Sequence, residues 1–237
     1  MFQYFDKIIR GTEKEDTLVI NQYLKGMIGK RFSLLNYYKE IPVSFDARLL
    51  SVENEMAEFE VHEYQAKVIG IEHKTLIYAN EKSGFQDDLY SEVFYVNTAK
   101  KKVILCKFGY AKIQANMRRF VRVKLDRPMQ AELIFEDSII QAGVNNISLG
   151  GAALNIMSAE HLVAGVTLNL FLKLPDISSD EIVEVGMTAT VINITGDVAP
   201  FTCILEFHPE KHSQQQIAYF INLRQVEIIK ELKELKS

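Results

Sequence analysis

The chain has 237 residues, of which 48% are hydrophobic and 24% are charged, a balance typical of globular proteins and not of disordered or fibrous ones. Its 27 lysines and arginines against 31 acidic residues give a formal net charge of −4, which argues against broad binding of nucleic-acid polymers, because neutralising many phosphates requires a basic surface. A chain of this length accommodates two domains that each bury their own core.

The cysteines and the hydropathy pattern bear on localisation. Cys106 and Cys203 lie far apart, and no signal peptide precedes the first charged segment, so we expect two reduced core thiols in a cytoplasmic protein. The longest apolar stretches, such as residues 166–174, fall well short of the ~20 residues that a membrane helix needs. We therefore expect no membrane insertion.

The first half of the chain is predicted to be a helix followed by short strands. Apolar residues recur at helical spacing over residues 12–28, and Thr12 and Glu15 are placed as a capping box. The period then changes to two, which predicts strands. These are expected at residues 43–49, 57–61, 67–72, 75–79, 90–96 and 103–108. This half, residues 1–111, is predicted to form a small antiparallel β-barrel or sandwich.

The second domain is predicted to span residues 112–237, and the joint lies within residues 109–117, where the charge pattern turns basic. Many short strands separated by turn residues predict a closed or nearly closed barrel. They are expected at residues 120–125, 129–135, 138–145, 152–155, 166–174, 183–195 and 201–207. From Pro209 onward apolar residues return to helical spacing, which predicts a C-terminal amphipathic helix. The fold class is therefore mainly β, with two small barrels.

Basic residues cluster at the predicted joint. Three of the eight arginines of the chain, Arg118, Arg119 and Arg122, fall within five positions, and residues 112–127 carry six basic residues against one acidic residue. An arginine fork bonds the O6/N7 edge of guanine in two places, clamps phosphate oxygens or stacks on a base. A patch this confined suits a small anion better than a polymer.

A second polar element follows after 23 intervening residues, with Asn146 and Ser148 ahead of Gly150 and Gly151. Asparagine and serine offer short polar contacts, and glycine lets the backbone come close to a ligand. Each element alone is a weak signal, because basic strand edges and polar turns are common. The two in this order, within an all-β pattern, favour ligand binding.

The pair closely resembles the Arg-x-x-x-Arg and Asn-x-Ser-x-x-Gly signature of PilZ domains, which are bacterial receptors for cyclic di-GMP. The resemblance covers residues 112–237 and includes residues 188–192, which look like a later barrel strand of the family. The first half looks, by architecture alone, like the split-barrel-like N-terminal domain that precedes PilZ in flagellar-brake-type proteins.

The resemblance implies a cyclic di-GMP site, with Arg118 and Arg122 on guanine edges and phosphates and Arg119 on phosphate or stacking. Asn146 and Ser148 would contact polar guanine edges, and Gly150 and Gly151 would allow close approach. An arginine directly before the first element accompanies binding of a stacked ligand dimer in the family. Met117 stands there in this chain, which favours one ligand per protomer.

The implied function is a receptor without catalytic activity, whose ligand changes the arrangement of the two domains and so regulates motility, biofilm or surface-polymer output. Its protein target would be a flagellar-motor or polymer-export component. The alternative is a protein-interaction module that binds no ligand and docks an acidic partner surface through the basic joint.

Enzyme hypotheses find little support. Ser148 lacks the glycine that a nucleophile elbow needs two residues earlier, and no Gly-rich phosphate loop is present. His208 and His212 lie four residues apart near Cys203, but Pro209 and Glu210 break the metalloprotease pattern, which favours a solvent-exposed histidine pair over a metal site. We expect neither a metal nor a cofactor.

Overall fold

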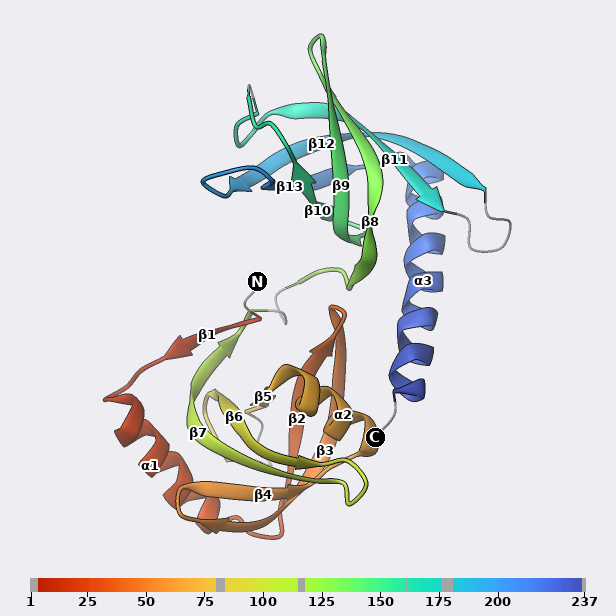
Figure 1. Ribbon diagram of the computed structural model, residues 1–237. Coiled ribbons are helices and arrows are strands. Elements are labelled where there is room, and N and C mark those ends of the chain that lie inside the picture. Colours follow the sequence, from red (N-terminus) through yellow and green to blue (C-terminus); the bar gives the residue numbers. More distant parts are fainter. Residues whose placement is uncertain (1–3, 80–83, 115–117, 161, 176–180, 236–237) are drawn as a thin grey trace. The chain divides into compact units, whose positions relative to one another are not determined.

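The chain divides into two compact units, each built mainly from antiparallel strands (Figure 1). The computed structural model describes residues 4–79, 84–114, 118–160, 162–175 and 181–235. The first unit comprises Met1–Tyr38, Pro42–Arg118 and Lys230–Ser237, and the second comprises Lys39–Ile41 and Arg119–Ile229. The predicted fold class, mainly β with two barrels, is confirmed.

Seven strands and two helices form most of the first unit. The strands are β1 (Phe5–Ile8), β2 (Arg31–Tyr38), β3 (Ile41–Glu53), β4 (Met56–Glu60), β5 (Lys74–Ile77), β6 (Asp88–Asn97) and β7 (Lys102–Ile113). They are ordered β1-β7-β4-β3-β2-β5-β6, and β6 also pairs with β7, which closes a ring of six strands with β1 added beside β7. The core contains Phe32, Leu49 and Phe59, all at most 1% exposed. The sequence pattern did not predict β1 or β2.

Helix α1 (Glu13–Lys25) confirms the predicted N-terminal helix and its capping box. The Thr12 hydroxyl accepts a hydrogen bond from the Glu15 backbone N–H at 3.2 Å, and a Glu15 carboxylate oxygen accepts one from the Thr12 N–H at 2.9 Å. These bonds satisfy two donors that a helix start leaves open. Ile20 and Leu24 are completely buried and anchor the helix in the core.

The strand predicted at residues 67–72 is wrong, because these residues lie in helix α2 (Glu63–Glu72). The His62 side chain accepts a hydrogen bond from the Tyr64 N–H and caps the helix start, and His73 ends it in the left-handed conformation. Val68 and Ile69 are completely buried. A short apolar run has the same appearance in a buried helix and in a buried strand, so periodicity did not separate them.

Six strands form the closed barrel of the second unit, in the order β10-β13-β12-β11-β8-β9. They are β8 (Arg122–Phe135), β9 (Ser138–Ser148), β10 (Gly151–Ile156), β11 (Thr167–Pro175), β12 (Ile182–Thr195) and β13 (Phe201–His208). The two strands expected at 120–125 and 129–135 are a single strand, β8, whose pairing with β9 is irregular between Lys124 and Met129. A closed ring leaves no sheet edge unpaired.

The last helix, α3 (Lys211–Glu234), confirms the predicted C-terminal helix, and its apolar stripe is buried. Ile217, Phe220 and Ile221 are at most 5% exposed. Near the helix end, Leu232 packs with Val43 and Val68 in a small cluster of the first unit. Burial of this stripe, more than helix propensity, stabilises a helix of this kind.

Candidate functional site

The two polar elements that the sequence singled out lie on neighbouring strands. Arg122 begins β8, and Asn146 and Ser148 lie near the end of β9. In the antiparallel register Arg122 pairs with Ser148, Val123 with Ile147, and Lys124 with Asn146. Residues 22 to 26 positions apart in the sequence are therefore direct neighbours across the sheet, with Cα atoms about 5 Å apart.

These polar side chains share the outer face of the barrel. Successive residues of a strand point to opposite faces, and cross-strand partners point to the same one. Val123 and Ile147 are completely buried in the barrel interior. Arg122 and Ser148, which alternate with them, therefore lie outside the barrel in the same row, and Lys124 and Asn146 form the next row.

Asn146 and Ser148 are nevertheless well covered, at 4% and 6% exposed. The Ser148 hydroxyl donates a hydrogen bond to the Gly151 carbonyl at 3.1 Å, which ties the turn between β9 and β10 together. Within the residues that the structure describes, the Asn146 side chain makes no hydrogen bond to protein. Its amide donors and its acceptor are therefore not used by described protein groups and can be offered to a ligand.

Both glycines of the turn have close neighbours. A Cβ atom on Gly150 would lie 2.9 Å from the ring of Phe120, the residue that follows Arg119, so the arginine segment contacts this turn. A Cβ atom on Gly151 would lie 2.1 Å from the Leu205 carbonyl oxygen of β13. Packing between β10 and β13 thus requires glycine at position 151 independently of any ligand.

The first two arginines of the cluster lie on either side of the division between the units. In the first unit the Arg118 guanidinium lies 5.6 Å from the centre of the Tyr4 ring, and Tyr4 stacks on Tyr37 at 4.0 Å. In the second unit the Arg119 guanidinium lies 5.2 Å from the Phe120 ring. Guanidinium groups over aromatic rings are held by cation–π attraction. Met117, on which the expected stoichiometry depends, lies outside the described residues.

Arg224 of α3 supports β8 beside the Asn146 row and was missed by the sequence analysis. Only 9% exposed, it donates to the Lys124 carbonyl at 3.4 Å, to Glu227 at 3.0 Å and to Asp126. Hydrogen bonds from Lys39, which belongs to the same unit, and from Arg224 hold the pKa of Asp126 below its ordinary value. The sequence did contain a signal for Arg224. It lies three residues after Ile221 and four before Ile228, and this spacing places it on the buried face of the helix.

The residues considered for a metal site do not form one. His208 ends β13 and bonds the Thr190 hydroxyl through Nε2 at 2.8 Å, whereas His212 lies in α3, so the two do not share a helix. Cys203 is completely buried, and burial raises its thiol pKa to about 11. Across the described ranges, no group of three or more His, Cys, Asp or Glu is placed to hold a metal ion.

Cys106 differs from Cys203, because it is only partly buried, so the expectation of two core thiols is wrong for this residue. Both cysteines are free. Burial, and secondarily the neighbouring Glu92 carboxylate, raise the pKa of the Cys106 thiol. A thiol with a raised pKa is a weak nucleophile and a poor metal ligand at neutral pH.

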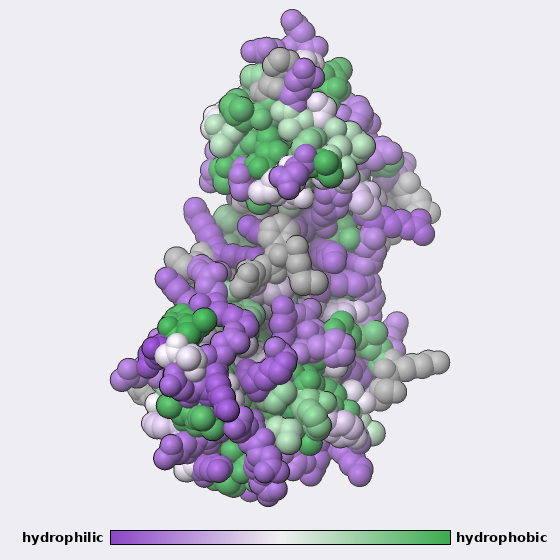
Figure 2. Space-filling view, turned by 60° about the vertical axis from the view of Figure 1, so that its left-hand side comes forward, coloured by the Kyte–Doolittle hydropathy of each residue, from purple (hydrophilic) through white to green (hydrophobic). Residues whose placement is uncertain are grey.

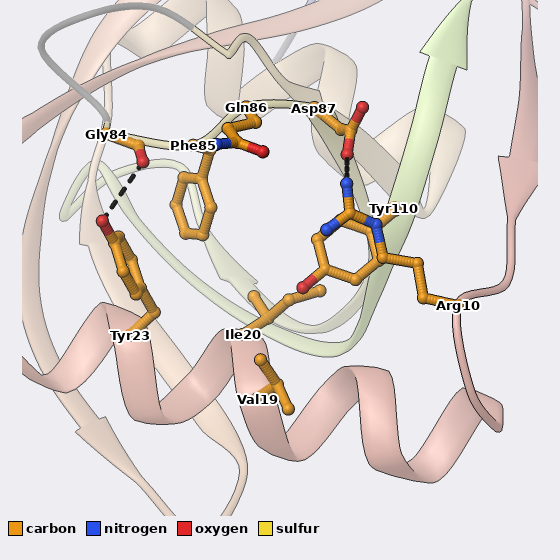
Figure 3. Close-up of a pocket in the computed structure, with 9 residues that line it drawn as sticks. All are labelled: Arg10, Val19, Ile20, Tyr23, Gly84, Phe85, Gln86, Asp87 and Tyr110. Carbon is orange, nitrogen blue, oxygen red and sulfur yellow. Dashed lines mark hydrogen bonds and ion pairs between the residues drawn. The ribbon is translucent and has the colours of Figure 1, made fainter.

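The first unit contains a separate cavity of about 200 Å³ between α1 and the segment at residues 84–87 (Figure 3). Val19 and Ile20 line one side, and the Tyr23 hydroxyl donates to the Gly84 carbonyl at 3.2 Å on another. At one end the Arg10 guanidinium lies 4.4 Å from the Tyr110 ring and pairs with Asp87. These polar groups already bond to one another, and the described lining residues offer no further charged group to a ligand.

Exposed apolar side chains are scattered among hydrophilic ones on the face shown in Figure 2. Over the whole described surface, the exposed apolar side chains include Tyr23 and Val19 of the first unit and Met157 and Val198 of the second, each between 48% and 77% exposed. Single exposed apolar residues are ordinary on protein surfaces. Among the helices of the described chain, none has the length and apolar character needed to cross a membrane.

Solved structures similar to this chain include the Bacillus subtilis inhibitor of motility MotI/DgrA, at 16% identity and a TM-score of 0.44, over 84% of this chain and 97% of that one. YcgR from Escherichia coli in complex with c-di-GMP has 10% identity and a TM-score of 0.44, over 98% and 97% of the two chains. The K. pneumonia MrkH–c-di-GMP complex has 15% identity and a TM-score of 0.42, over 98% and 100%.

Comparison with curated protein sequences gave no match. The family model described as the PilZ domain matches residues 116–223. The match contains Arg118, Arg119 and Arg122 together with Asn146–Gly151, the residues on which the sequence resemblance was based. It also covers all six strands of the second barrel. Residues 116–223 of this chain are therefore a PilZ domain.

Proposed function

We propose that this protein is a non-catalytic receptor for cyclic di-GMP that acts in the cytoplasm. The observation that carries the proposal is the pairing of Arg122 with Ser148 and of Lys124 with Asn146 on the outer face of a PilZ barrel. Cations, a hydroxyl and an amide without a hydrogen bond to described residues thereby meet on one patch. MrkH and YcgR, which this chain resembles, were solved with c-di-GMP.

The chemistry of the ligand matches these groups. Cyclic di-GMP carries two phosphodiester charges and two guanines, so its receptor must neutralise anions and recognise base edges. In the proposed complex Arg118 and Arg122 bond guanine O6/N7 edges and phosphates, and Arg119 contacts phosphate or stacks on a base. Asn146 and Ser148 supply the short polar contacts, and the lack of a side chain at Gly150 and Gly151 lets the ligand approach the backbone there.

Ligand binding is proposed to change the arrangement of the two units. The division between the units falls between Arg118 and Arg119, so a ligand that engages both arginines constrains the segment that joins them. A ligand shifts such an equilibrium only by its differential affinity for the two arrangements. A protein target in motility, biofilm formation or surface-polymer export would recognise one arrangement. One ligand per protomer is the proposed stoichiometry.

Isothermal titration calorimetry with cyclic di-GMP tests the proposal. Loss of one bidentate arginine contact should weaken binding about ten- to a hundredfold, so Arg118→Ala/Arg122→Ala should bind far more weakly than the wild type. Arg48→Ala is the matched control, since Arg48 is an exposed strand arginine of the first unit. Its affinity should equal that of the wild type.

Absence of binding to the wild type, or equal heats for the wild type and the double variant, would refute the receptor proposal. A pull-down of partner proteins distinguishes the alternative, a module that works without ligand. In that case the captured proteins would not change with cyclic di-GMP, and charge reversal at Arg118 and Arg119 would abolish capture.

A further inference from the structure

The outer row that contains Arg122 and Ser148 continues across two more strands. Ser148 pairs with Gly151 of β10, and Gly151 pairs with Glu206 of β13. The row therefore reads Arg122, Ser148, Gly151, Glu206 on four adjacent strands. Glu206 pairs in turn with Thr190 of β12. Glu206 was not among the residues that the sequence analysis singled out.

The adjacent interior row establishes which way these side chains point. Val123, Ile147, Ala152 and Leu205 pair with one another one residue further along the strands. All four are at most 5% exposed, so they fill the barrel. Because neighbours along a strand alternate between faces, Glu206 lies outside together with Arg122 and Ser148. Its side chain is exposed.

Gly151 leaves a gap in the row. Adjacent strands are about 4.8 Å apart, so the backbones at Ser148 and Glu206 are separated by about 10 Å with no side chain between them. A Cβ atom at Gly151 would overlap the Leu205 carbonyl, which keeps this gap open. A ligand group can therefore approach the backbone of β10 between the strands that carry Ser148 and Glu206.

The Glu206 carboxylate is available to a ligand. In the described part of the chain it forms no ion pair and no side-chain hydrogen bond. Its neighbours on the outer face are already engaged, because the Thr190 hydroxyl bonds His208 at 2.8 Å and lies 3.3 Å from the Thr167 hydroxyl. An exposed carboxylate beside a basic ligand site repels a phosphate, so its contribution must be to the base.

We propose that Glu206 reads the Watson–Crick edge of one guanine of the bound cyclic dinucleotide and is a specificity-determining residue of the site. The proposal rests on the proposed function. Guanine presents two acceptors, O6 and N7, on one edge and two donors, N1–H and the 2-amino group, on another. Arginine only donates hydrogen bonds, and an ionised carboxylate only accepts them. Arg122 therefore matches the O6/N7 edge of guanine, and Glu206, beyond the gap, matches N1–H and the 2-amino group. Adenine, which has no N1–H and no 2-amino group, leaves the carboxylate without a partner.

Calorimetric titrations with three ligands test this role. Cyclic di-GMP is compared with cyclic di-IMP, which lacks only the 2-amino groups, and with cyclic di-AMP. The wild type should bind cyclic di-GMP about tenfold or more tightly than cyclic di-IMP, as expected for loss of a base-edge contact. Glu206→Ala and Glu206→Gln should weaken cyclic di-GMP about ten- to a hundredfold and bring the two affinities closer together.

The ratio of affinities is the decisive readout, because a general loss of structure would weaken all ligands alike. Glu184→Gln is the matched control, since Glu184 is an exposed carboxylate on β12, six residues before Thr190. It should leave both the affinity and the ratio unchanged. If the wild type binds cyclic di-GMP and the Glu206 variants keep the wild-type affinity and the wild-type preference over cyclic di-IMP, the role of Glu206 is refuted. The receptor proposal then still stands. If the wild type binds no cyclic di-GMP, the receptor proposal itself fails.

Discussion

Replacing Gly151 with alanine should separate β10 from β13. The new Cβ atom would lie 2.1 Å from the Leu205 oxygen, and contacts below 3.0 Å essentially never occur, so the strands must move apart by about 0.9 Å. The position of Cβ is fixed by the backbone and its partner is a backbone oxygen, so no rotamer change relieves the clash. The shift also strains the hydrogen bond from Ser148 to the Gly151 carbonyl and the one from the Phe207 N–H to the Gly150 carbonyl.

The expected cost follows from these contacts. Overpacking costs about 1–3 kcal/mol, each weakened hydrogen bond adds about 1 kcal/mol, and the lower backbone entropy of unfolded alanine offsets about 0.4–1 kcal/mol. The net local destabilisation is about 2–4 kcal/mol. Amide hydrogens of β10 and β13 should therefore exchange about 30- to 900-fold faster than in the wild type.

Hydrogen exchange measured segment by segment is the suitable assay, because a chain of two units need not unfold in one step. Gly150→Ala serves as the control. Its Cβ would meet the Phe120 ring, a side chain able to move, so a cost of about 1 kcal/mol is expected. Exchange of β10 and β13 within twofold of the wild type in Gly151→Ala would show that the close approach to Leu205 does not constrain this position.

Three further predictions concern stability. Thr12→Ala removes half of the capping box of α1 and should destabilise the first unit by about 1 kcal/mol in urea titrations, whereas an unchanged midpoint would contradict the capping role. Arg224→Met leaves the Lys124 carbonyl without this donor and Asp126 with Lys39 as its remaining partner. It should destabilise the second unit by about 1–3 kcal/mol, visible as faster exchange in β8 and refuted by unchanged exchange there. The pKa of Cys203 is raised from 9.0 to about 11, so the folded state favours the protonated thiol. The contribution of this thiol to the free energy of unfolding is therefore present below pH 9 and is lost as the pH rises from 9 to 11. The urea midpoint of Cys203→Ala should therefore decline less between pH 9 and 11 than that of the wild type. Equal declines in the two proteins would refute the assignment of this pH dependence to Cys203.

Local chemistry made several elements predictable. The capping box of Thr12 and Glu15 fixes the start of α1, because its hydrogen bonds are made within four residues. Alternation of Leu168, Leu170, Leu172 and Leu174 predicts β11, since one face of the strand must be buried. The strand prediction at residues 67–72 failed because a short apolar run looks alike in a buried helix and in a buried strand, and tertiary packing decided for a helix.

The sequence by itself determined the two barrels, the terminal helices and the PilZ signature, because each depends on spacing within a short segment. Only the tertiary structure decided that Arg122 and Ser148 are neighbours, that Gly151 is required by the Leu205 carbonyl, and that Arg224 holds β8. It also placed Glu206 in the same outer row, although 54 residues separate it from Gly151 along the chain. Strand register sets these relations, and register depends on how the whole barrel closes, which no local pattern contains.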